Sequence, residues 1–133
     1  MKKRKVILAD SHQNMLEGIR GLLEIMFDTV VMVADENSMF EAIENIKPDL
    51  MVVDLSLPVS GESNIVVKIK SCYPDLKFIV LSVHDESAIA KEMISSGASG
   101  FVLKRSIAFD LIPAIKKIMQ GQTYISPSVK SHS

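Results

Sequence analysis

Residues 50–54 read LMVVD, an unbroken apolar run that ends on a carboxylate. Runs of the same kind recur along the chain, and all are rich in Val, Ile and Leu without alternating polar residues. This pattern is typical of strands buried on both faces of a parallel sheet. We therefore predict five strands: VILAD (6–10), VVMVA (30–34), LMVVD (50–54), FIVLS (78–82) and GFVLK (100–104).

The segments between these runs have the period of amphipathic helices. In the second segment, Met39, Ala42, Ile43 and Ile46 recur on one helix face. Because helices that join neighbouring strands make those strands parallel, the alternation predicts an α/β fold with right-handed crossovers. We expect a three-layer α/β/α sandwich around a doubly wound five-stranded sheet of order 2-1-3-4-5.

The last segments give three further expectations. Gly97 and Gly121 follow the fourth and fifth helical stripes and should end those helices. Pro113 lies inside the fifth stripe, so this helix either starts late, near Asp110, or is kinked. We expect residues 1–122 to form the domain and residues 123–133 to form a tail or the start of a linker.

Composition narrows the class of protein. The chain has 133 residues, 47% hydrophobic and 23% charged, which is typical of one soluble globular domain. Its net charge of −1 gives no reason to expect direct binding to nucleic acid or membranes, and no apolar run reaches the ~18 residues of a membrane helix. The single cysteine excludes an intrachain disulfide and fits a cytoplasmic protein.

Polar residues stand where four of the predicted strands end: Asp10, Asp54, Ser82 and Lys104. Taken singly, each has an ordinary explanation as a helix cap, a turn residue or a surface lysine. Together they lie at the edge where α/β sheets bind ligands. Two carboxylates suit Mg²⁺, a carboxylate can attack phosphorus, and a lysine and a serine can bind phosphoryl oxygens. The set predicts a magnesium-dependent aspartyl-phosphate site.

Several separated motifs resemble the receiver domain of two-component response regulators, over residues 4–127. They are ILAD, VVDLSLPVSGE, IVLSVHDE, SGASGFVLK and GQTYISP. SGASGFVLK and AIKKIMQGQTYISP are most similar to the NarL/FixJ subgroup. The resemblance implies a flavodoxin-like receiver fold, usually followed in that subgroup by a LuxR-type helix-turn-helix domain that binds DNA and regulates transcription.

The resemblance also implies roles for the site residues. Asp54 would be the phosphoacceptor that takes a phosphoryl group from a sensor histidine kinase, and Lys104 would pair with a phosphoryl oxygen. Asp10, Asp54 and the backbone carbonyl of Ser56 would hold Mg²⁺. Ser82 would be the switch hydroxyl that moves toward the phosphoryl group.

Three more residues receive roles from the same resemblance. Phe101 would be the aromatic that changes rotamer with the switch hydroxyl, with simple packing as the alternative. Ser56 and His84 lie where the family tunes the lifetime of the phosphoryl group.

The chain departs from the family pattern beside Asp10. The family normally has a second acid there, and this chain has Ser11; Arg105 likewise stands where many receivers have proline. Serine is a favoured N-cap, so Ser11 should begin the first helix. The lost charge predicts weakened Mg²⁺ binding and slow phosphorylation. His12 supports the alignment without indicating that it binds metal.

Three classes of function remain. We expect a phosphorylation-controlled switch that is not a turnover enzyme, whose output is altered dimerisation or release of a DNA-binding domain absent from this chain. A pseudo-receiver that acts without phosphorylation is the alternative that Ser11 favours. A phosphatase is disfavoured because Ser56, two residues after Asp54, is not an acid, and because no insertion could form a cap over the site.

Overall fold

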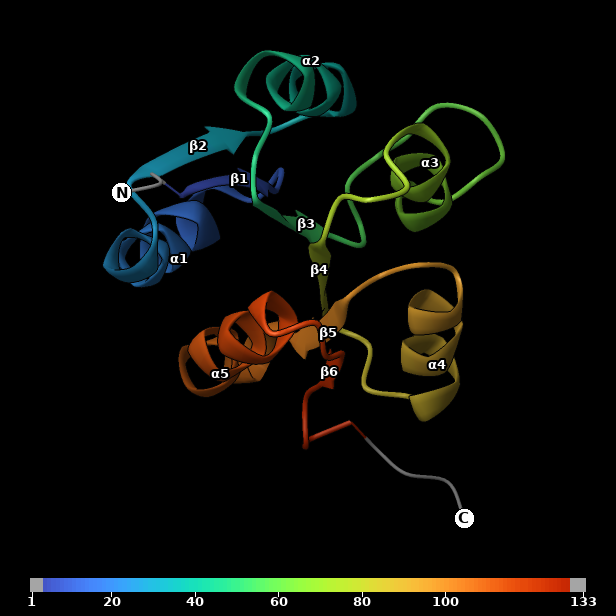
Figure 1. Cartoon of the computed structure of the whole chain (residues 1–133). Coiled ribbons are helices and arrows are strands. Elements are labelled where there is room, and N and C mark those ends of the chain that lie inside the picture. Colours follow the sequence, from blue (N-terminus) through green and yellow to red (C-terminus); the bar gives the residue numbers. More distant parts are fainter. Residues whose placement is uncertain (1–3, 130–133) are drawn as a thin grey trace.

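The computed structural model describes residues 4–129, except for the side chains of residues 13–16, and shows helices on both faces of one parallel sheet (Figure 1). The strands are β1 (Lys5–Ala9), β2 (Thr29–Val33), β3 (Leu50–Asp54), β4 (Phe78–Ser82), β5 (Gly100–Leu103) and β6 (Tyr124–Ile125). The helices are α1 (Gln13–Met26), α2 (Glu36–Ile46), α3 (Ile65–Cys72), α4 (Ser87–Ser95) and α5 (Ile107–Met119), with a 3₁₀ turn at Lys104–Ser106.

The strand order is β2-β1-β3-β4-β5-β6, and every neighbouring pair is parallel. Helices α1 and α5 cover one face of the sheet, and α2, α3 and α4 cover the other (Figure 1). Alternate residues of β1 enter the two cores: Val6 packs toward α1 and α5, and Ile7 toward the opposite face. The predicted three-layer fold and the order 2-1-3-4-5 are confirmed, because central strands buried on both faces need apolar residues at every position.

The prediction of five strands is wrong by one strand. Tyr124 and Ile125, which we placed in the tail, form β6 and pair with Gly100 and Phe101 of β5. A Cβ atom on Gly100 would lie 2.7 Å from the Ile118 side chain and 3.5 Å from the Tyr124 carbonyl oxygen. The missing side chain at this position therefore lets α5 and β6 approach β5 closely.

A buried carboxylate holds β6 in place. Asp110 of α5 accepts hydrogen bonds from Ser106 (2.7 Å), Ser126 (2.8 Å) and Tyr124 (3.0 Å), so both of its oxygens have donors. The Leu103 N–H in turn donates to the Ser126 hydroxyl at 3.0 Å. We call Ser106, Asp110, Tyr124 and Ser126 the Asp110 network. Periodicity does not reveal it, because Tyr124 and Ser126 lie outside the helix, 14 and 16 residues from Asp110.

Helix α5 runs through Pro113, so the late start near Asp110 is wrong. The helix begins at Ile107, directly after the 3₁₀ turn, and ends at Met119. Pro113 removes the donor that the Phe109 carbonyl would use, but both residues lie on the exposed face, where water can replace it. Gly97 (φ 124°) and Gly121 (φ 86°) follow the ends of α4 and α5, as predicted. Within residues 4–129 no helix is long and apolar enough to cross a membrane.

Candidate functional site

The polar residues that end the strands converge on one edge of the sheet. Asp10 follows β1, Asp54 ends β3, Ser82 ends β4 and Lys104 follows β5. Asp10, Asp54 and Ser82 are each at most 1% exposed. Because the strands are parallel, their carboxyl ends meet at this edge. The structure therefore brings these four residues to one edge, as the sequence predicted.

Asp54 is the most strongly hydrogen-bonded carboxylate at this edge. Lys104 Nζ lies 2.7 Å from Asp54 Oδ2. Ser56 donates its backbone N–H to Oδ1 at 3.0 Å and its hydroxyl to Oδ2 at 2.9 Å. Burial raises the pKa of Asp54, but the hydrogen bonds from Lys104 and Ser56 outweigh burial and hold that pKa below its ordinary value. Asp54 is therefore an ionised carboxylate at neutral pH.

Asp10 is less well satisfied. Its Oδ1 accepts the His12 backbone N–H at 2.8 Å, whereas its buried Oδ2 has no hydrogen-bond donor. Lys104 Nζ lies 3.4 Å from Oδ2, close enough for an ion pair but not aligned for a hydrogen bond. A buried carboxylate oxygen without a donor is costly unless a cation reaches it. One ammonium balances only one of the two negative charges. The oxygens of the two carboxylates are therefore ligands that fit a hard divalent cation.

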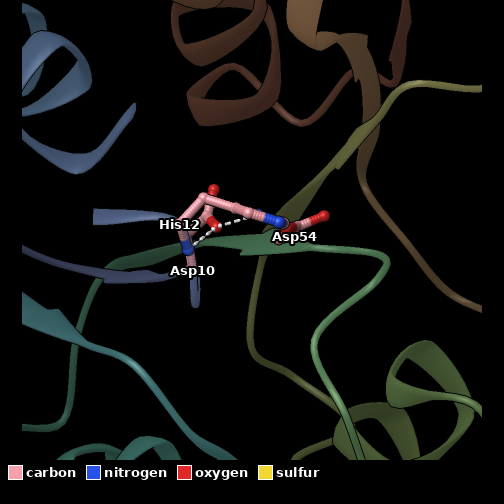
Figure 2. A group of neighbouring side chains, drawn as sticks. All are labelled: Asp10, His12 and Asp54. Carbon is pink, nitrogen blue, oxygen red and sulfur yellow. Dashed lines mark hydrogen bonds and ion pairs between the residues drawn. The ribbon is translucent and has the colours of Figure 1, made fainter. Parts of the chain in front are cut away.

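His12 completes this cluster (Figure 2). Its Nδ1 lies 3.1 Å from Asp10 Oδ1, 3.2 Å from Asp54 Oδ2 and 3.4 Å from Lys104 Nζ. Among the described residues, Asp10, His12 and Asp54 form the one group of at least three His, Cys, Asp or Glu side chains close enough to share a metal ion. Sequence reasoning did not place His12 beside these two carboxylates. The available signal was a histidine two residues after a strand-ending acid, where the chain turns back over the sheet edge.

The prediction that Ser11 caps the first helix is wrong. The N-cap residue of α1 is His12, in an extended conformation, and it makes no side-chain cap hydrogen bond. Ser11 is exposed and lies outside the helix. The carboxylate of Asp10 accepts the His12 N–H at 2.8 Å, a bond that precedes the helix and does not cap its first turn.

Ser82 and Asp54 both line a pocket of ≈ 150 Å³ at the sheet edge. The Ser82 hydroxyl accepts the His84 backbone N–H at 2.9 Å. His84 is exposed, and its Nδ1 lies 4.0 Å from the Glu86 carboxylate. Phe101 is fully buried in the core on the face of α2, α3 and α4.

Arg105, the second departure from the family pattern, links two loops. It donates to Asp85 at 2.9 Å and to the Ser128 carbonyl at 3.3 Å. These contacts join the residue after Lys104 to the loop between β4 and α4 and to the segment after β6.

The amino-acid sequence of this chain is similar to those of known regulatory proteins. The model of the response regulator receiver domain family matches residues 6–116. The transcriptional regulatory protein DegU of Brevibacillus brevis is 33% identical over 96% of this chain and 55% of its own length. The oxygen regulatory protein NreC of Staphylococcus epidermidis is 32% identical over 91% of this chain and 57% of its own length. The chain thus spans little more than half the length of these curated relatives.

Solved structures show the same likeness. The RcsB response regulator of Salmonella typhimurium superposes with a TM-score of 0.88 at 28% identity, over 97% of this chain and 66% of that one. A LuxR-family two-component response regulator from Aurantimonas sp. SI85-9A1 gives a TM-score of 0.84 at 29% identity, over 96% and 93% of the two chains. The fold, the site and these relatives agree: the chain belongs to the response regulator receiver domain family, in the NarL/FixJ subgroup.

Proposed function

We propose that this chain is a cytoplasmic switch that accepts a phosphoryl group on Asp54 from a sensor histidine kinase. The observation that carries the proposal is the Asp54 carboxylate itself. It is buried, it is ionised, Lys104 lies 2.7 Å from one of its oxygens, and it lines a small pocket at the sheet edge. An ionised, positioned carboxylate beside a fixed cation is what nucleophilic attack on phosphorus requires.

The transfer step is a simple displacement. An oxygen of Asp54 attacks the phosphorus of a phosphohistidine on the kinase, so that a P–O bond forms while the P–N bond breaks. The electron pair stays on the kinase imidazole, which takes up a proton. Lys104, already within 3.4 Å of both Asp10 and Asp54, offsets the negative charge on the phosphoryl oxygens.

The residues of the site fit a divalent cation. Asp10, Asp54 and the backbone carbonyl of Ser56 would hold Mg²⁺, which when bound neutralises charge on the phosphoryl oxygens. The Oδ2 of Asp10, which has no hydrogen-bond donor, is the structural sign of this fit. With Ser11 in place of an acid, the site has one negative charge fewer than the family pattern, and Mg²⁺ binding is correspondingly weak.

Phosphorylation would then bias the face around β4 and β5. The Ser82 hydroxyl leaves its bond to His84 and crosses the pocket to the phosphoryl group, and Phe101 changes rotamer with it. Ser56 and His84, on either side of the pocket, set the lifetime of the phosphoryl group.

The output is regulation of transcription through a further domain. RcsB is described as dimers bound to DNA, and DegU as a transcriptional regulatory protein. By likeness to them, the partners of this chain are the kinase, a second copy of the chain, and DNA contacted only through a C-terminal helix-turn-helix domain. Residues 123–133 then include both β6 and the beginning of the connection to that domain.

A pseudo-receiver is the second candidate, and one observation favours it. Lys104 and the His12 ring both lie within 3.5 Å of the two carboxylates, while Ser11 lacks the charge that would attract a metal. In this alternative the site acts as a fixed structural cluster, and partner binding does not depend on phosphorylation.

Treatment with acetyl phosphate, followed by intact and peptide mass spectrometry, separates the two candidates. We expect one phosphoryl group on Asp54, none in Asp54→Ala, and unchanged labelling in Asp75→Ala, which removes an exposed carboxylate far from the site. Absence of label at saturating divalent metal would support the pseudo-receiver. Labelling that survives Asp54→Ala would show that the site is wrongly assigned.

A further inference from the structure

We propose that His12 replaces the missing acid as a metal ligand, through Nδ1, and that the site therefore prefers a first-row transition cation such as Mn²⁺ over Mg²⁺. The inference deepens the proposed function, because it concerns the metal of the same site. The observation that points to it is the position of the His12 ring between Asp10 and Asp54 (Figure 2).

The distances from His12 Nδ1 to the two carboxylates are those of hydrogen bonds, and they also match the spacing of ligands around a single ion. Cis ligands of an octahedral cation with bonds of about 2.1 Å lie about 3 Å from one another. His12 Nδ1 is 3.1 Å from Asp10 Oδ1 and 3.2 Å from Asp54 Oδ2. Each of the three residues offers one ligand atom, and these atoms lie within 4.8 Å of one another. A cation can therefore be bound with small side-chain adjustments.

The charges leave room for a divalent cation. Asp10 and Asp54 carry two negative charges, Lys104 carries one positive charge, and a ligating imidazole is neutral. The site without metal therefore has a net charge of −1. One of its buried oxygens, on Asp10, has no hydrogen-bond donor. A divalent ion would satisfy this oxygen and leave one positive charge at the site for an incoming phosphoryl group.

The donor types decide which cation is preferred. Mg²⁺ demands oxygen ligands and gains little from imidazole, whereas Mn²⁺ and the later first-row metals accept nitrogen and bind more tightly to mixed nitrogen and oxygen sites. The family pattern has a second carboxylate where this chain has the exposed Ser11. Exchange of that carboxylate for His12 nitrogen lowers the affinity for Mg²⁺ more than the affinity for Mn²⁺.

The backbone holds His12 in position for this role. Residue 12 is extended (φ −96°, ψ 95°), and its N–H donates to Asp10 Oδ1 at 2.8 Å. One ligand thus orients the backbone of the next, as supporting hydrogen bonds do at metal sites. The ring is 59% exposed, so a hydrated cation reaches it from solvent.

Calorimetric titration with MnCl₂ and with MgCl₂ tests the preference. His12→Ala should weaken Mn²⁺ binding by at least ~10-fold and Mg²⁺ binding by much less, so that the ratio of the two dissociation constants collapses. The control is Asp75→Ala, which removes an exposed potential metal ligand far from the site, and it should leave both constants unchanged. If His12→Ala tightens binding, or weakens both metals equally, the proposal is overturned, because His12 then competes with the cation or acts only through the fold.

Pulsed EPR of the Mn²⁺-loaded protein gives a direct readout of the ligand. We expect coupling to an imidazole ¹⁴N in the wild type and in Asp75→Ala, and its loss in His12→Ala. Absence of this coupling in the wild type, or its persistence without His12, would overturn the assignment.

These outcomes are independent of phosphorylation. A protein labelled on Asp54 but without nitrogen coupling would retain the proposed function and lose the histidine ligand. A protein with nitrogen coupling but no label on Asp54 would retain the ligand and lose the phosphoacceptor function.

Discussion

Two regions of the molecule bury carboxylates in opposite ways. In the Asp110 network, three hydroxyls donate to one carboxylate, and both of its oxygens are satisfied. At the sheet edge, Asp10 and Asp54 share one ammonium, and one Asp10 oxygen has no donor. A complete network stabilises the fold that surrounds it, whereas an incomplete one retains binding capacity for a ligand. The contrast therefore lies between Asp110, whose oxygens are both satisfied, and Asp10, whose buried Oδ2 has no hydrogen-bond donor and can still accept a ligand.

The largest expected effect comes from breaking the complete network. Asp110→Ala leaves three hydroxyls without their acceptor and loosens β6 from α5, so the free energy of unfolding should fall by about 3 kcal/mol. Urea unfolding followed by circular dichroism measures this change, with Asp75→Ala as the control. A loss below about 1 kcal/mol would show that the network contributes little to stability.

The second-largest expected effect is on the affinity of the Asp10 and Asp54 site for Mg²⁺. Ser11→Asp restores the second carboxylate beside Asp10, so the affinity for Mg²⁺ should rise by about 10- to 100-fold. Titration calorimetry measures this, and Ser63→Asp, in an exposed loop, provides a control for the added charge. Unchanged Mg²⁺ affinity would mean that the missing charge is already compensated.

A third substitution should raise the free energy of unfolding, whereas Asp110→Ala should lower it. Asp10→Asn removes one of two carboxylates that face a single ammonium, together with a buried anionic oxygen that has no donor. In metal-free buffer, the free energy of unfolding should rise by about 1 kcal/mol. Chemical denaturation in EDTA provides the measurement. A loss of stability as large as that of Asp110→Ala would contradict the contrast between the two regions.

The smallest effect concerns Tyr124 of the network. Burial and the neighbouring Asp110 carboxylate raise the pKa of Tyr124 to about 12 from 10.0. Because the folded state favours the neutral phenol, its contribution to stability is complete below pH 10 and is lost as pH rises toward 12. Tyr124→Phe should lower the free energy of unfolding by about 0.5–1 kcal/mol at pH 7 and remove this alkaline decline.

Denaturant unfolding of both proteins between pH 8 and 12 isolates the phenol's contribution. The hydrogen bond from Tyr73 to Glu44 also raises the pKa of Tyr73, but Tyr73 is present in both proteins and its effect cancels in the difference. Parallel pH profiles for the wild type and Tyr124→Phe would show that the phenol does not titrate in this way.

Much of the candidate site could be predicted from the sequence because its main residues end strands. Asp10, Asp54, Ser82 and Lys104 each follow or close an apolar run, and parallel strands bring their ends to one edge. Ser11 and His12 could not be placed in the same way. They lie between a strand and a helix. A shift of one residue in where the helix begins would change which side chain faces the site.

The first five strands, their order and the residues at their carboxyl ends could be predicted from the sequence, because hydrophobic periodicity and crossover handedness are local or nearly universal rules. Three features could not: the pairing of β6 with β5, the three hydroxyls bound to Asp110, and the position of His12 between two carboxylates. Each of these depends on contacts between residues distant in sequence, such as His12 with Asp54, whose geometry no local pattern encodes.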